Sequence, residues 1–183
     1  MILGAWLAGA PLIALVALHN SDSVAQIMSW PPPQAARNLS ILGPADSRAL
    51  LTYQVYELNG SCFEAWQWIQ LALGAVLLVV LVFGYRTARP PLFLCGFMIV
   101  LTIAALFYVI PDLQRLGRIA SFLPAGAAEI AAFRKYTIAY AGIELAKWLS
   151  GFLLATLLLR RAHDHSSTRR PHSTSKSRWV RAS

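Results

Sequence analysis

Charged side chains are scarce in this sequence. Its 183 residues include 16 Lys and Arg and 8 Asp and Glu, so 13% are charged, whereas a soluble domain carries about 25%. Cysteine is also scarce, with two residues, which excludes a small scaffold held together by disulfides. The sequence lacks a glycine-rich phosphate loop, a His-Glu-x-x-His pair and a Gly-x-Ser-x-Gly elbow. These absences argue against the common classes of soluble enzyme.

Long apolar runs dominate the sequence instead, and 57% of its residues are hydrophobic. Four apolar segments occur, at residues 2–18, 63–85, 92–111 and 138–159. Each is close to the ~20 residues that a helix needs to cross the hydrocarbon core of a bilayer. We therefore predict an all-α fold, in which an integral membrane four-helix bundle over residues 1–161 is followed by a disordered basic tail over 162–183.

The positions of the basic residues predict a topology. The short connector between the second and third apolar segments contains two arginines and no acid. Seven of the sixteen Lys and Arg residues lie in residues 160–183. The residues expected to set topology and to contact lipid are Arg86, Arg89, Arg160, Arg161, Arg169 and Arg170. Because basic loops stay in the cytoplasm, both termini are predicted to be cytoplasmic, in a cell membrane that we expect to be a bacterial inner membrane. The basic tail is expected to bind anionic lipid headgroups, and no nucleic acid.

The two long connectors, 19–62 and 112–137, are expected to lie on the outer side and to be helical. Ser21 is placed to cap a short separate helix that ends before the prolines at 31–33. Asp46 or Ser47 is predicted to cap a second helix, which has no strong breaker before the end of the second apolar segment. The sequence therefore predicts packed helical extensions on the outer side.

Polar residues close to the apolar segments are the candidate functional residues, since a charge at membrane depth costs several kcal/mol unless it is paired or hydrated. Helical spacing places them in two stripes, on the second and fourth helices: Glu57, Glu64, Gln67, Tyr140, Glu144 and Lys147. These stripes predict a polar pocket that opens outward and binds a cation or a small polar ligand. The alternative is structural: Glu144 pairs locally with Lys147, and Glu64 lies at the water boundary.

No catalytic residue, metal site or cofactor is predicted. Cys62 and Cys95 lie at opposite ends of their segments, and about twenty helical residues separate these levels by roughly 30 Å. This distance is too long for a disulfide, so each cysteine is expected to be a packed apolar residue.

One segment resembles a known family. The run Phe63-Glu64-Ala65-Trp66-Gln67-Trp68-Ile69-Gln70-Leu71, with the apolar segment and Arg-containing turn that follow, resembles the small four-span membrane family typified by transmembrane protein 205. Phe133, Tyr136 and the polar-then-apolar fourth segment are similar to the last span of that family. This chain reads Tyr140-Ala141-Gly142 where that family has a His-Gly pair. The resemblance implies a four-span membrane fold and assigns no role to any residue, because the family has no known function.

These observations favour a non-enzymatic multi-pass membrane protein that binds a partner or a small ligand through its polar pocket. Partners considered are the bilayer itself, another membrane protein and a second copy of the chain. The alternative is a small transporter or ion-conducting protein that uses Glu64, Glu144 and Lys147.

Overall fold

The computed structural model describes residues 1–84, 89–124 and 126–167, except for the side chains of residues 35, 38, 39 and 161–167. The elements are α1 (Ile2–Ser29), α2 (Pro33–Leu42), α3 (Pro44–Gly84), α4 (Arg89–Ala104), the π-helical turn η1 (Ala105–Val109), α5 (Ile110–Ala120) and α6 (Ala128–Ser167). No strand occurs in these ranges. Since α4, η1 and α5 form one continuous rod, the described residues contain four helices that are long and apolar enough to cross a membrane. The predicted all-helical fold with four such helices is confirmed.

The prolines and glycines of the sequence end the helices. Pro31–Pro33 follow α1, Gly43 separates α2 from α3 with φ of +80°, and Gly126 lies between α5 and α6 with φ of +106°. Both glycine conformations are left-handed, which side chains with a Cβ rarely adopt. The prediction that one unbroken helix runs from the first long connector through the second apolar segment is confirmed, although α3 begins at Pro44, ahead of the predicted caps Asp46 and Ser47.

The predicted break at Ser21 is wrong. Helix α1 continues to Ser29, and the Ser21 hydroxyl donates to the Ala17 carbonyl at 2.9 Å, inside the same helix. A serine hydroxyl can bond one turn back without ending a helix, so it did not need to act as a cap. In the last helix, α6 reaches Ser167 and includes the first residues of the predicted tail; residues 168–183 lie outside the described part.

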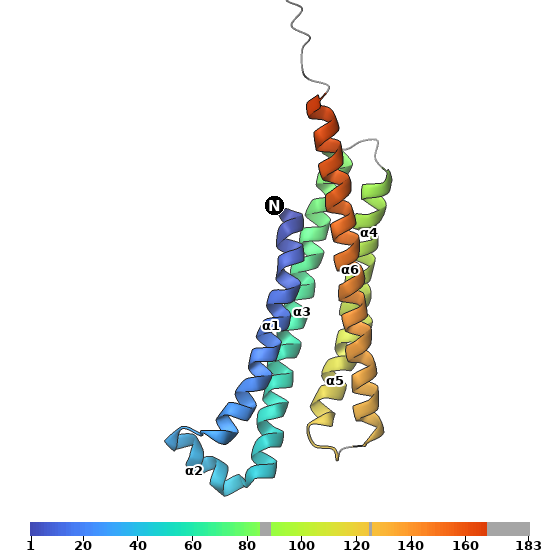
Figure 1. Cartoon of the computed structure of the whole chain (residues 1–183). Helices are drawn as coiled ribbons and strands as arrows, with labels where there is room; N and C mark the ends of the chain where they lie inside the picture. Colours follow the sequence, from blue (N-terminus) through green and yellow to red (C-terminus); the bar gives the residue numbers. More distant parts are fainter. Residues whose placement is uncertain (85–88, 125, 168–183) are drawn as a thin grey trace, which may run out of the picture.

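The helices pack in the order α1, α3, the α4–α5 rod and α6 (Figure 1). Helices α3 and α6 are diagonal partners with no close backbone contact, and α1 touches α6 only sparsely. The N-terminus, the end of α3, the start of α4 and the end of α6 lie at one end, which we call the N-terminal end. Helix α2 and the α5–α6 turn lie at the other, the α2 end. This is the grouping that the topology prediction requires; which end faces the cytoplasm stays a prediction.

The apolar core lies near the N-terminal end. It is formed by Trp6, Leu77, Leu81, Cys95, Met98 and Leu154. Helices α1 and α3 approach through a reciprocal arrangement, because Trp6 of α1 packs over Gly74 and Trp66 of α3 packs over Gly9. A Cβ at Gly151 of α6 would lie 2.8 Å from the side chain of Leu7, so α1 and α6 also meet closely here. Small residues permit this close helix approach.

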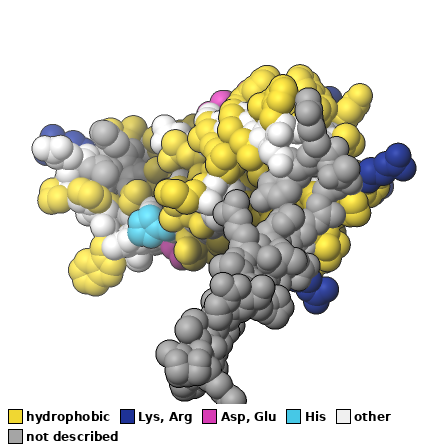
Figure 2. Space-filling model, turned by 90° about the horizontal axis from the view of Figure 1, so that it is seen from above, with side chains coloured by type: hydrophobic (Ala, Val, Ile, Leu, Met, Phe, Trp, Pro, Cys, Tyr) yellow, Lys and Arg dark blue, Asp and Glu magenta, His cyan; other side chains and the backbone are white. Residues whose placement is uncertain are grey.

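Hydrophobic side chains occupy most of the described surface that is visible from the N-terminal end (Figure 2). Phe83, Phe93 and Tyr108 are each more than 70% exposed on the surfaces of α3, α4 and η1. Exposed aromatic side chains of this size would be costly in water and are favourable against lipid chains. These exposed aromatic side chains are what the apolar composition of the four long helices predicts.

Candidate functional site

Polar side chains from the diagonal helices α3 and α6 meet inside the bundle. We call this group the polar cluster, and its members are Gln67, Gln70, Tyr140, Glu144 and Lys147. The Lys147 Nζ lies 2.6 Å from Glu144 Oε1, 3.0 Å from Gln67 Oε1 and 2.5 Å from Gln70 Oε1. The Gln67 Nε2 donates to Glu144 Oε1 at 2.8 Å and to the Tyr140 hydroxyl at 3.0 Å. Long side chains thus bridge two helices whose backbones do not touch.

The polar cluster is deeply buried. The side chain of Lys147 is 1% exposed and that of Glu144 is 16% exposed, while Gln67 and Gln70 are fully buried. A buried charge is tolerated only if it is paired and hydrogen-bonded, and here one carboxylate and one ammonium compensate each other. The cluster is therefore electrically balanced, with its charges held by two glutamines.

Four of the six predicted site residues belong to this cluster, and the other two lie elsewhere. Glu57 pairs with Arg118 of α5 at 2.7 Å, with both side chains about half exposed. Glu64 accepts a hydrogen bond from the Gln114 amide at 3.4 Å, also at an exposed position. These two carboxylates tie α3 to α5. The local Glu144–Lys147 pair, which was the structural alternative, is also present.

Gln70 makes the shortest contact with Lys147 but is not among the residues predicted from the sequence. The signal for it was present, because Gln70 follows Gln67 by three residues and therefore lies on nearly the same helix face. An amide deep within an apolar segment carries a larger desolvation cost than one at its edge, so it needs a hydrogen-bond partner. Its depth within the apolar segment, more than its spacing, marks it as a partner of the buried lysine.

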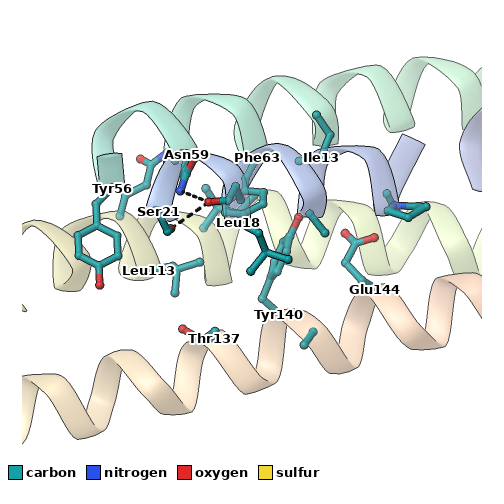
Figure 3. A pocket seen from close by; sticks show the side chains of 18 of the residues that line it. Ile13, Leu18, Ser21, Tyr56, Asn59, Phe63, Leu113, Thr137, Tyr140 and Glu144 are labelled. Atoms are coloured by element: carbon teal, nitrogen blue, oxygen red, sulfur yellow. Dashed lines mark hydrogen bonds between the residues drawn. The ribbon is translucent and has the colours of Figure 1, made fainter. Parts of the chain in front are cut away.

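A groove of about 700 Å³ adjoins the polar cluster and lies between α1, α3, α5 and α6 (Figure 3). We call it the lateral groove, because it occupies the region in which α1 and α6 make few contacts. Most of its wall is apolar, with Ile13 and Leu18 from α1, Phe63 from α3 and Leu113 from α5. Glu144 of the polar cluster lines it as well.

Hydrogen bonds hold the wall of the lateral groove where α1 meets α3. The Asn59 amide donates to the Ala17 carbonyl at 3.3 Å, and Asn20 donates to the Asn59 side-chain oxygen at 2.8 Å. Figure 3 shows Asn59 and Ser21 converging on that carbonyl. These hydrogen bonds hold α1 against α3. None of them reaches α6.

Two buried polar atoms of groove-lining residues make no hydrogen bond within the described residues. They are Glu144 Oε2 and the indole Nε1 of Trp148. Figure 3 shows Glu144 and Tyr140 projecting from α6 toward the facing helices. The Tyr140 hydroxyl lies beside Glu144, but a carboxylate oxygen can accept two hydrogen bonds and so keeps acceptor capacity. Both atoms are closed off from the space of the groove, although other atoms of the two residues line it.

The arginines expected to set topology are only partly described. Arg89 starts α4 and Arg160 lies near the end of α6, and both are exposed at the N-terminal end. The placement of Arg86, Arg169 and Arg170, and of the Arg161 side chain, lies outside the described residues. Their contact with lipid headgroups stays a prediction.

Comparison with known proteins gives no assignment: no family model, no curated protein and no solved structure matches this chain. The resemblance of the Phe63 to Leu71 run to a four-span family therefore stays a prediction. What the fold and site define is a helical protein with four apolar helices, a balanced polar cluster and a groove beside it.

Proposed function

We propose that this chain is a multi-pass membrane protein without catalytic activity, and that it binds a small amphiphilic ligand in the lateral groove. The observation that carries the proposal is the groove itself, an apolar cavity of about 700 Å³ that ends beside a buried ion pair. Its volume is within the usual range for small-molecule sites, which are mostly apolar with a few placed polar groups. A ligand with an apolar body and one polar end matches that division.

The course of the helices supports access from the bilayer. Helices α1 and α6 meet closely at Leu7 and Gly151, near the N-terminal end, whereas the groove is lined by the part of α1 from Ala10 onward. A ligand dissolved in lipid could therefore pass between α1 and α6 without crossing water. In the predicted topology this gap lies in the outer half of the membrane.

A test uses three single-chain amphiphiles that share one hydrocarbon chain: oleyl alcohol, oleic acid and oleylamine. Native mass spectrometry of the full chain, released from detergent micelles, counts bound molecules as the concentration of each probe rises. We expect at least one probe to bind saturably. Ala141→Phe, which fills the groove from α6, should abolish this binding.

The matched control is Ala139→Phe, the same change at an exposed position of α6 that does not line the groove. It should bind the probes as the unmodified chain does. The proposal fails if none of the three probes binds saturably, or if both variants bind equally well.

The alternative function, transport or ion conduction through Glu64, Glu144 and Lys147, is favoured by one observation, a buried ion pair in an apolar helix. Intramembrane charges of this kind often mark ion pathways. Proton or cation flux into proteoliposomes, lost in Glu144→Gln, would support it. Under the binding proposal, flux should equal that of empty vesicles.

A further inference from the structure

The lateral groove crosses the boundary of the apolar part of the bundle. The four apolar segments end toward α2 at residues 18, 63, 111 and 138. These ends lie close to one level, because Asn59 of α3 donates to the Ala17 carbonyl of α1, and Phe63 of α3 packs against Tyr140 of α6 with 5.3 Å between the ring centroids. The groove is lined on both sides of this level, so it begins within the apolar part of the bundle and ends beyond it.

The length of the groove matches the depth of one bilayer leaflet. Residues of α6 line it from Phe133 to Trp148, which corresponds to about 22 Å along the helix axis. A bilayer is about 40–45 Å thick with its head groups, so one leaflet is about 20–22 Å deep. A lipid of the leaflet at the α2 end would therefore fit the groove along its whole length, with its head beyond the apolar boundary.

The polar groups that a ligand can reach lie at the α2 end of the groove. At the other end, Glu144 Oε2 and Trp148 Nε1 are closed off, so a ligand meets an apolar surface there. The Tyr56 hydroxyl, by contrast, is not closed off and makes no hydrogen bond among the described residues. The Thr137 hydroxyl donates to the Phe133 carbonyl at 2.9 Å and keeps its acceptor capacity. Figure 3 shows Tyr56 toward one end of this lining and Glu144 toward the other.

Resting on the proposed function, we infer that the ligand of the lateral groove is a lipid of the surrounding bilayer, held in the orientation of the leaflet at the α2 end. Its head lies near Tyr56 and Thr137, and one hydrocarbon chain lies between α1 and α6 toward Trp148. The sparse contact of α1 with α6 lets this chain enter sideways while the head stays at the water boundary. The reverse orientation is unfavourable, because it would bury the head where no polar atom is free to replace its hydration.

The test uses two phosphatidylcholines that differ only in the place of a photoreactive diazirine, beside the ester or near the terminal methyl of one chain. The full chain is labelled in detergent micelles, which impose no leaflet orientation, and the labelled residues are mapped by mass spectrometry. Labelling that excess unmodified phosphatidylcholine removes is saturable. We expect saturable labelling near Tyr56 and Thr137 from the ester-side probe, and near Leu145 and Trp148 from the methyl-side probe. Labelling of Phe93, which is exposed outside the groove, should persist with excess lipid.

On the protein side, Tyr56→Phe removes the hydroxyl and keeps the ring that packs against Phe133. One lost hydrogen bond weakens binding by about 2- to 12-fold, so saturable labelling should require that much more lipid. The matched control is Tyr53→Phe, the same change on the same helix at a residue that packs against Phe122 and does not line the groove. It should label as the unmodified chain does.

Each outcome separates this inference from the proposed function. Labelling at the opposite ends, or at both ends by both probes, overturns the orientation, and equal lipid requirements of the two tyrosine variants overturn the placement of the head at Tyr56. Absence of saturable labelling while an oleyl probe binds overturns the lipid assignment, and the groove proposal stands. Saturable binding of neither the lipids nor any oleyl probe overturns both. The mapping uses the unmodified chain, so it holds even if Tyr56→Phe does not fold.

Discussion

Lys147→Met should be among the most destabilising single changes in this protein. The side chain is 1% exposed and its ammonium contacts Glu144, Gln67 and Gln70. Removing it leaves an uncompensated carboxylate and two glutamine oxygens without their donor. Breaking a buried ion pair from one side typically costs 3–5 kcal/mol, so we expect a loss of about 4 kcal/mol in the free energy of unfolding.

The assay is reversible unfolding in mixed micelles with increasing SDS, followed by circular dichroism. Lys135→Met is the matched control, because Lys135 is exposed on the same helix and its loss should change the free energy by less than about 0.5 kcal/mol. A second change, Glu144→Gln, should restore most of the loss in Lys147→Met by removing the orphaned charge. Glu64→Gln should not, since Glu64 is bound to Gln114 at an exposed position. Additive effects of the Lys147 and Glu144 changes on the free energy of unfolding would refute the coupled cluster.

Three further predictions concern the rest of the chain. Reporter fusions after Arg89 should be cytoplasmic and fusions at Gly126 should lie on the outer side; the reverse result would contradict the topology. A chain truncated after Arg161 should keep its helical circular dichroism and thermal transition, and loss of the folded protein would show that the tail packs. Gly151→Leu should destabilise by about 1–3 kcal/mol, because a Cβ there lies 2.8 Å from a leucine of α1, whereas Gly142→Leu, with nothing within 4 Å, should be tolerated. Equal unfolding free energies for these two variants would argue against the close contact of α1 with α6.

Local sequence signals were sufficient for the four long helices, whereas the short helix α2 was not predicted. Length of apolar run, the prolines at 31–33 and the glycines at 43 and 126 are local signals, and helical hydrogen bonds are made within each segment. For the same reason the continuous course of α3 could be predicted. The false break at Ser21 shows the limit of such signals, because a hydroxyl can cap a helix or bond within it and only its neighbours decide which.

The candidate site was also predicted only in part from the sequence. Helical spacing put Tyr140, Glu144 and Lys147 on one stripe of α6, and this stripe faces Gln67 in the structure. The spacing could not show that Glu57 lies outside the cluster, because it says which residues share a face of one helix and nothing about what that face meets.

The lateral groove was decided by tertiary structure alone. The groove exists because α1 packs along α3 and touches α6 only sparsely. This arrangement is a property of the four helices together, and no single segment encodes it. Local hydrogen bonding and hydrophobicity fix the helices from the sequence, whereas the gap between two of them depends on how side chains of different helices pack, and only the folded chain determines that.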